Sequence, residues 1–221
     1  MDELKINALF DLNKTLAKPL LSRFTYPWEA LPEIKDFILA LGKTLSSEEY
    51  DSPSPDVWVA KTAKVAETAF IAPPTIICAG AEVRHCAFIR GSVLVGEGCV
   101  VGNSTEIKNA ILFDSVQVPH FNYVGDSILG YRSHLGAGAV TSNVKSDKTE
   151  VTVLVHGEKI GTGRKKFGAA VGDFTEVGCN SVLNPGTVLG RHCTVYPTSS
   201  VRGYIPGHSI HKLDGVVRKR T

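Results

Sequence analysis

The stretch from Val59 to Phe113, VAKTAKVAETAFIAPPTIICAGAEVRHCAFIRGSVLVGEGCVVGNSTEIKNAILF, decides the fold. Every sixth residue in it is large and apolar: Val59, Val65, Ile71, Ile77, Val83, Ile89, Val95, Val101, Ile107 and Phe113. The residues four places later are Ala63, Ala69, Thr75, Ala81, Ala87, Val93, Cys99, Thr105, Ile111 and Gln117, of which seven are Ala, Thr or Cys. A period of six fits neither the 3.6 residues of a helical turn nor a sheet of hairpins. It is typical of a parallel β-helix, in which short strands turn a corner and stack on the coil below.

The repeat continues toward the C-terminus with two slips and one long interruption. It slips by one residue at Val118, runs through Val124, and resumes after a second slip at Leu129 and Leu135. It returns at Val171, Val177, Leu183, Leu189, Val195 and Val201, with Thr175, Ser181, Thr187, Cys193 and Ser199 at the small position. Large aliphatic residues should fill the prism, small residues should fit its corners, and stacked coils should satisfy each other's main-chain groups about 4.8 Å apart. The fold class expected is therefore an all-β solenoid.

The interruption predicts a protruding loop over residues 141–166. Val151 to Val155 alternates in polarity, and the turn-like sequence from His156 to Lys159 follows it. This pattern is typical of a β-hairpin. The segment ends in the basic run Arg164-Lys165-Lys166, and so long an excursion from a regular solenoid favours a functional role.

The first part of the chain predicts helices. Only Gly42 precedes residue 80, and the other 20 of 21 glycines lie from Gly80 onward. Ile34, Phe37, Ile38 and Leu41 recur at helical spacing after Pro32, and residues 6–21 carry a second plausible helical face. The breaker-rich residues 51–56 are the best boundary. We therefore expect a helical N-terminal region at 1–56, the β-helix at 57–210 and a basic C-terminal tail at 211–221, which is either solvated or in contact with coenzyme A phosphates.

Composition restricts the possible partners and compartment. The chain has 24 basic and 22 acidic residues, so no wide basic field favours nucleic acid or an anionic membrane. No run of 18 apolar residues and no secretory signal is present in the sequence, so we expect a cytoplasmic protein without a membrane partner. The five cysteines form no CxxC pair, and we expect Cys99 and Cys193 to be small buried hydrophobes.

Four strings of the sequence carry a resemblance to a known family. They are Ile107-Lys108-Asn109, VPHFNYVGD (118–126), LGAGAVTSN (135–143) and TGRKKFGAAVGD (162–173). These strings resemble the acetyltransferase half of the bifunctional glucosamine-1-phosphate acetyltransferase/N-acetylglucosamine-1-phosphate uridylyltransferases, and especially the archaeal-type sugar-1-phosphate nucleotidylyltransferase/acetyltransferases. The resemblance covers about Val57 to Ile210. It implies a left-handed β-helix, acetyl-CoA as co-substrate, an amino-sugar phosphate as acceptor, and a homotrimer with sites between subunits.

The resemblance also assigns roles to individual residues. His120 is implied to be the general base, because a base must remove a proton as the amine attacks the thioester carbonyl. The implied acceptor-binding residues are Arg90, Lys108, Tyr123, His134, Asn143 and Lys166, whose cations and hydroxyl suit a phosphate. The implied coenzyme contacts are Ala137, Cys179 and Pro197, with the N–H near Ala137 as the oxyanion donor.

Two features leave alternatives open. His134 stands where bacterial enzymes of this family carry asparagine, so the acceptor could be another amino sugar, or acceptor binding could be lost. Residues 1–50 contain one glycine and no Gly-rich phosphate loop, so we expect no nucleotidyl transfer. The rival function is a non-catalytic β-helix module that binds a sugar phosphate or assembles with a nucleotidyltransferase. Turnover of acetyl-CoA with a panel of amino-sugar phosphates discriminates the two.

The histidines also raise the question of a metal site. His85, His134, His192, His208 and His211 invite comparison with trimeric β-helix carbonic anhydrases, which bind zinc through three histidines. Two of those ligands lie close together on one coil. The spacings in this sequence do not fit that arrangement, and we expect no metal.

Overall fold

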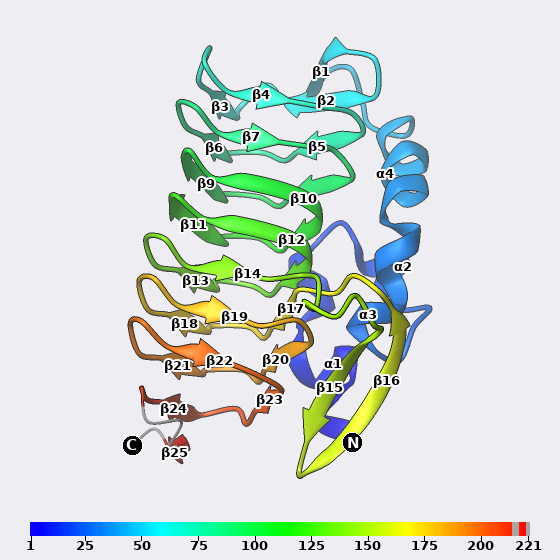
Figure 1. Cartoon of the computed structure of the whole chain (residues 1–221). Coiled ribbons are helices and arrows are strands. Elements are labelled where there is room, and N and C mark those ends of the chain that lie inside the picture. Colours follow the sequence, from blue (N-terminus) through cyan, green and yellow to red (C-terminus); the bar gives the residue numbers. More distant parts are fainter. Residues whose placement is uncertain (214–216, 220–221) are drawn as a thin grey trace.

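Successive coils of the hexad segment stack in register, and this makes the chain a left-handed parallel β-solenoid (Figure 1). The computed structural model describes residues 1–213 and 217–219, the last three by their main chain only. Val57 pairs with Thr75 and Thr75 with Val93, so one coil takes eighteen residues. Each coil contributes one short strand to each of three faces of a prism. The predicted solenoid is confirmed.

The helices and strands have the following bounds. The helices are α1 (Ile6–Leu9), α2 (Lys18–Leu21), α3 (Pro27–Ala30) and α4 (Ile34–Gly42), with 3-10 turns at Asp2–Leu4, Leu12–Lys14 and Leu31–Glu33. Face 1 contains β2 (Val57–Ala60), β5 (Thr75–Ile77), β8 (Val93–Val95), the second halves of β10 (Glu106–Leu112) and β12 (Tyr123–Leu129), β17 (Ala169–Val171), β20 (Thr187–Leu189) and β23 (Tyr204–Ile205). Face 2 contains β3 (Lys64–Val65), β6 (Glu82–Val83), β9 (Val100–Asn103), β11 (Gln117–His120), β13 (His134–Leu135), β18 (Glu176–Val177), β21 (Thr194–Val195) and β24 (Ser209–His211). Face 3 contains β4 (Phe70–Ile71), β7 (Phe88–Ile89), the first halves of β10 and β12, β14 (Val140–Thr141), β19 (Val182–Leu183) and β22 (Ser200–Val201). The others are β1 (Tyr50–Ser54), β15 (Val151–Val155), β16 (Glu158–Arg164) and β25 (Val217–Lys219).

The interior is filled as the hexads predict. The inward aliphatic residues are fully buried from Ile77 onward, whereas Val65 at the first coil remains 38% exposed because no coil lies above it. Residues at the small position also link coils: Thr105 donates its hydroxyl to the carbonyl oxygen of Val118 at 3.0 Å. Cys99 and Cys193 are buried as predicted, and the Cys99 thiol donates to the Phe113 carbonyl. Burial raises the pKa of the Cys193 thiol, which suits a packing role.

The first register slip lies earlier than the sequence predicts. Leu112, not Phe113, pairs with Val95, so the coil shortens to seventeen residues between Ile107 and Leu112 and not at Val118. Strand β10 bends across a corner there and belongs to two faces. Phe113 is also buried, but it packs against Phe10 of the N-terminal region, with ring centroids 5.1 Å apart. A buried aromatic residue one place after the inward position therefore concealed the slip.

The outer side of face 1 is apolar as well, and the N-terminal region covers it. The middle residues of its strands point outward, yet Ile76, Leu94, Ile111, Ile128 and Val188 are fully buried. Helix α4 packs on β5, β8 and β10, and the remaining helices continue along the same side (Figure 1). The helical region thus covers face 1 of the prism. Its buried residues belong to the same hydrophobic core as those of the prism.

The N-terminal region is less regular than the sequence predicts. The second expected helix, over residues 6–21, is broken into the one-turn helices α1 and α2 with a 3-10 turn between them. The carboxylate of Asp11 accepts a hydrogen bond from the N–H of Asn13 and begins that turn. Helix α3 was not predicted. In the part of the chain that the structure describes, no helix is both long and apolar enough to cross a membrane.

The long insertion forms the predicted hairpin but does not protrude. Strands β15 and β16 pair antiparallel, and His156 and Gly157, both with positive φ, make the two-residue turn. Val151 and Val153 are fully buried because β15 packs against β20 and β23. Its main chain comes so close to the corner at Gly186 that a Cβ atom there would lie 2.5 Å from the Thr152 carbonyl oxygen. The hairpin therefore extends the cover of face 1.

Both ends of the predicted β-helix region also carry extra strands. Most of the predicted breaker, residues 51–56, lies in β1 (Tyr50–Ser54), which pairs antiparallel with β2 at the open end. At the other end β25 pairs antiparallel with β24. The predicted basic tail is 211–221; its side chains from residue 214 onward, and its contact with coenzyme A phosphates, lie outside the described residues.

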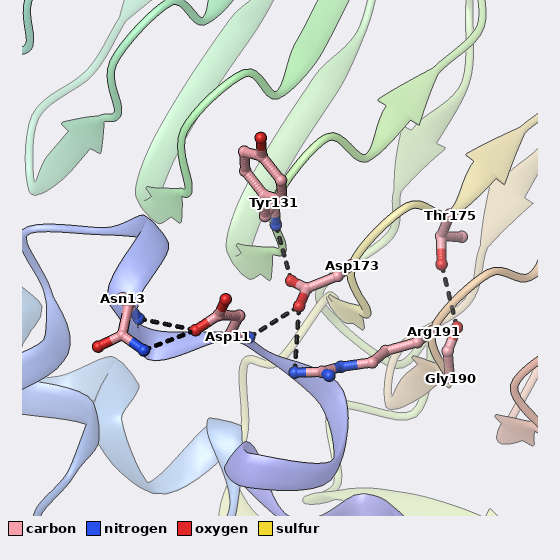
Figure 2. A network of polar contacts seen from close by, with 7 residues as sticks. All are labelled: Asp11, Asn13, Tyr131, Asp173, Thr175, Gly190 and Arg191. Atoms are coloured by element: carbon pink, nitrogen blue, oxygen red, sulfur yellow. Dashed lines mark hydrogen bonds and ion pairs between the residues drawn. The ribbon is translucent and has the colours of Figure 1, made fainter.

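A buried carboxylate connects the N-terminal region to the prism (Figure 2). Asp173 has only 1% of its side chain exposed and forms an ion pair with Arg191 at 3.2 Å. Its two oxygens accept the main-chain N–H groups of Asp11 at 2.7 Å and Tyr131 at 2.8 Å. Burial raises the pKa of Asp173, and these donors oppose that shift. The Asp173 N–H also donates to Leu9, so one residue connects two coils and the N-terminal segment.

We predict that Asp173→Ala destabilises the protein by about 3–5 kcal/mol, because it leaves Arg191 and two buried N–H groups without their acceptor. Urea unfolding followed by circular dichroism measures the loss. Asp11→Ala is the matched control, since it removes an exposed carboxylate at the same junction and should cost about 1 kcal/mol. Equal unfolding midpoints for the two variants would contradict the role of Asp173.

Candidate functional site

At the corner between faces 2 and 3, the predicted base lies one coil above the first of the predicted coenzyme contacts. The N–H of Gly138 donates to the carbonyl of His120 at 3.0 Å, and the N–H of Asn180 donates to that of Ala137 at 2.8 Å. The N–H of Thr198, which follows Pro197, donates to Cys179 at 2.8 Å. His120, Ala137, Cys179 and Pro197 therefore occupy equivalent places on four successive coils, about 4.8 Å apart.

His120 is held by its main chain while its ring is free. It ends β11, pairs in register with Asn103, and donates its main-chain N–H to the side-chain Oδ1 of Asn122 at 3.1 Å. The ring is exposed, and no residue in the described ranges makes a hydrogen bond or ion pair with it. The imidazole is thus available to a substrate or to another subunit.

Asn122 is a positioning residue that the sequence reasoning did not select. It is 2% exposed and donates its amide to the carbonyls of Gly136 at 2.8 Å and Ala139 at 3.0 Å. One buried side chain therefore ties the corner of His120 to the corner of Ala137. The signal available in the sequence was its place two residues after His120.

In the part of the chain that the structure describes, the main-chain N–H of Ala137 has no acceptor. The neighbouring N–H groups of Gly136, Gly138 and Ala139 all donate to carbonyls. For Ala137, and equally for Cys179, no acceptor is found among residues 1–213 and 217–219. An unengaged N–H one coil below the base can donate to a developing oxyanion.

Face 3 carries a polar cluster at its far end, next to face 1. Arg90 forms an ion pair with Glu106 at 2.7 Å, and Lys108 lies on the coil above Gly125. Tyr123 is half-buried, and burial, together with the negative charges of Asp126 and Glu106, raises the pKa of its hydroxyl. A tyrosine that keeps its proton is a hydrogen-bond donor.

Two amides and one carboxylate complete this cluster. The side-chain amide groups of Asn109 and Asn143 both donate to Asp126, at 2.9 and 2.5 Å. Asp126 is only 5% exposed. The sequence reasoning selected Asn143 for the site but neither Asn109 nor Asp126.

The basic end of the insertion returns to the same place. The N–H of Phe167 donates to the Asn143 carbonyl at 3.0 Å, and the N–H of Gly168 donates to the Asp126 carbonyl at 2.9 Å. Lys166, whose side chain is exposed, immediately precedes Phe167 and Gly168 in the sequence. The structure therefore brings Lys166 next to Asn143 from twenty-three residues away in sequence.

His134 lies elsewhere. It is on β13 in face 2, and its Nδ1 makes a 2.8 Å hydrogen bond with Glu176 on the next coil. Within one chain, His134 is therefore on a different face from Lys108 and Tyr123.

The other histidines do not gather into a metal centre. His85 contacts the side chain of Asn103, and Asn103 lies two coils above Ala137. His192 stacks on both Phe174 and His208, with ring centroids 4.7 Å apart in each pair. Within the described ranges, no three His, Cys, Asp or Glu side chains lie close enough to hold a metal ion.

Comparison with known proteins gives the family. A family model described as the GMPPB C-terminal domain matches residues 71–208, more than half of the chain. The chain belongs to this family. The GMPPB C-terminal domain accordingly coincides with the prism from β4 to the corner before β24.

Curated relatives match the same part of the chain. The bifunctional sugar-1-phosphate nucleotidylyltransferase/acetyltransferase of Sulfurisphaera tokodaii is 33% identical over 52% of this chain and 29% of its own length. The bifunctional protein GlmU of Methanococcus vannielii is 34% identical over 63% of this chain and 34% of its own length. The chain thus spans about a third of the relatives it matches, and the predicted resemblance is confirmed.

Solved structures resemble the chain more distantly. The polySia-specific acetyltransferase NeuO is 10% identical, with a TM-score of 0.44 over 76% of this chain and 88% of its own. A mutant of GDP-perosamine N-acetyl transferase from Caulobacter crescentus, in complex with CoA and GDP-perosamine, is 15% identical, with a TM-score of 0.34 over 73% of this chain and 56% of its own.

Proposed function

We propose that the chain is an acetyl-CoA-dependent N-acetyltransferase that acts on an amino-sugar phosphate. The observation that carries the proposal is the stacking of His120 directly above Ala137. It places a free imidazole and an unengaged N–H on neighbouring coils of one corner. Acyl transfer from a thioester needs a base for the amine and a donor for the oxyanion. The name of the Sulfurisphaera tokodaii relative includes an acetyltransferase, and the proposal assigns no nucleotidyl transfer to residues 1–221.

The reaction uses these two groups in sequence. The acceptor amine attacks the thioester carbonyl while His120 takes its proton. The Ala137 N–H stabilises the negative charge on the tetrahedral oxygen. The C–S bond then breaks, the amide forms, and coenzyme A leaves as a thiolate that recovers the proton from His120. Asn122 keeps base and donor at a fixed separation through its bonds to both corners.

The two ligands are assigned to different parts of the site. The pantetheine arm of acetyl-CoA lies along the corner formed by Ala137, Cys179 and Pro197, where the N–H groups of Ala137 and Cys179 have no acceptor in the described part of the chain. The acceptor phosphate lies among cations and a hydroxyl on face 3. These groups are Arg90, Lys108, Tyr123 and Lys166, with Asn143 beside them. His134 lies on face 2 and can reach this phosphate only from another subunit.

A homotrimer completes the site. Face 1 is covered by the N-terminal helices and the hairpin, so subunit contacts fall on the other faces and corners. Phe121 is 61% exposed directly after His120, which is typical of an interface residue. The His120 ring has no orienting partner in the described part of its own chain, and a neighbouring subunit can supply one. Closed three-fold symmetry repeats this contact at each site.

We expect light scattering to report three times the chain mass at micromolar concentration. Phe121→Ser should weaken this association because it removes an exposed aromatic ring from the proposed subunit interface. A stable wild-type monomer would contradict the trimer.

His120→Ala should lower acetyl transfer by roughly 10²–10⁴, the usual contribution of a positioned base. The fold should survive because the ring is exposed. Acetyl-CoA turnover with glucosamine 1-phosphate is the measurement, and the ascending limb of the pH profile of kcat/KM should disappear. His85→Ala is the matched control, since it lies in the same column two coils above. Near-normal turnover by a folded His120→Ala protein would remove His120 from the mechanism.

Lys166→Ala should raise the KM for the acceptor more than it lowers kcat. Loss of one charged contact to phosphate should cost about 1.5–3 kcal/mol. Lys165→Ala removes the neighbouring, equally exposed charge and should leave KM unchanged. If both variants keep the wild-type KM, Lys166 is a solvated surface residue.

A further inference from the structure

Two lysines at the end of the insertion are held only through their neighbours in the chain. Lys165 and Lys166 are exposed, and neither makes a hydrogen bond or an ion pair with any residue that the structure describes. They lie between Arg164, the last residue of β16, and Phe167, which is fully buried. The position of Lys166 therefore depends on what holds these two flanking residues.

Helix α3 of the N-terminal region contacts the chain on both sides of the two lysines (Figure 1). It packs on β16, and the indole ring of Trp28 lies against the ring of Phe167, with ring centroids 5.7 Å apart. Trp28 is only 2% exposed and stacks on Tyr26, 4.7 Å away. The Glu29 carboxylate accepts the N–H groups of Thr25 and Tyr26 and fixes the start of the helix.

Phe167 connects this helix with the candidate site. Its N–H donates to the carbonyl of Asn143 at 3.0 Å, and its own carbonyl accepts the N–H of Gly186 at 3.2 Å. These main-chain bonds fix where the residue lies, whereas close packing of its ring on Trp28 fixes how the peptide is rotated about them. Because Lys166 directly precedes Phe167, that packing also sets the direction in which Lys166 leaves the corner.

We propose that Trp28 is a positioning residue for acceptor binding, which packs on Phe167 and thereby holds Lys166 toward the acceptor phosphate. This deepens the proposed function and rests on it for the role of Lys166. A contact to phosphate weakens steeply when its donor is displaced or rotated. The N-terminal region lies outside residues 71–208, which the family model matches, and the proposal gives it a part in the site besides covering face 1.

Trp28→Leu tests this role, and Phe10→Leu is the matched control. Phe10 makes the corresponding aromatic contact between the N-terminal region and the prism, on Phe113, at the corner between faces 1 and 2. Each variant loses one aromatic pair at the same boundary, so both should unfold at a lower urea concentration. Only Trp28→Leu should raise the KM for glucosamine 1-phosphate, about fivefold and with little change in kcat. The KM for acetyl-CoA should not change in either variant.

A double-mutant cycle separates positioning from a general loss of packing. Trp28→Leu should add nothing to the acceptor KM once Lys166 is replaced by alanine, because no charge remains to be positioned. Trp28→Phe, which keeps an aromatic ring, should restore most of the wild-type KM. An unchanged acceptor KM in Trp28→Leu, or additive effects of Trp28→Leu and Lys166→Ala, would overturn the proposal. Phe167→Leu removes the other ring of the same contact and replaces Trp28→Leu if that variant does not fold.

Hydrogen exchange separates this inference from the proposed function. The N–H groups of Phe167 and Gly168 are both hydrogen-bonded, so their exchange reports local opening of this segment. They should exchange about tenfold faster in Trp28→Leu than in Phe10→Leu. If they do and the wild type transfers no acetyl group, the proposed function fails, and the holding of this segment by Trp28 stands. If they exchange equally fast in the two variants, the positioning role is overturned even where transfer occurs.

Discussion

The main-chain hydrogen bonds between successive coils are the constraint on which the rest of this structure depends. Each strand donates to the coil below it, as Lys64 does to Ala81 and Gly178 to Val195, both at 2.8 Å. Such a ladder survives only if neighbouring coils have nearly the same circumference. Coils therefore take eighteen residues, seventeen where β10 and β12 bend across a corner, and sixteen at the C-terminal end, where Leu189 pairs with Ile205. Longer insertions must leave the ladder and return to it, as the hairpin between β14 and β17 does.

The same ladder arranges chemistry in columns. Corner residues adopt positive φ, as Ser104, Phe121 and Asn180 do, and each corner stacks on the next. Residues one coil apart are then neighbours about 4.8 Å apart, whatever their separation in sequence. His120 and Ala137 meet in this way, and so do Asn109, Asp126 and Asn143. A regular solenoid thus positions polar groups with little help from side-chain packing, except where a buried residue such as Asn122 adds a connection.

Face 1 shows how the prism acquires a cover. Outward residues of a β-helix are ordinarily solvated, but here a second apolar column with Ile76, Leu94 and Ile111 follows the strands. Exposing that column would cost roughly 25 cal/mol for each Å² of apolar surface. The N-terminal helices and the valines of β15 bury it, and Asp173 anchors their junction by polar contacts that the helices cannot make for themselves. The cover leaves faces 2 and 3, with the candidate site, open.

The sequence by itself determined the solenoid, because a large aliphatic residue at every sixth position can be buried on one side only if each hexad turns a corner. It also predicted the hairpin and, through local motifs, proposed His120 and Lys166 as site residues. It could not place the first slip, since Phe113 is buried against Phe10 and imitates an inward residue. Nor could it show that the hairpin packs against face 1, that His134 lies on face 2, or that Asp126 accepts hydrogen bonds from two asparagines. These features depend on contacts between residues that are distant in sequence, and only the stacking of coils decides which of them meet.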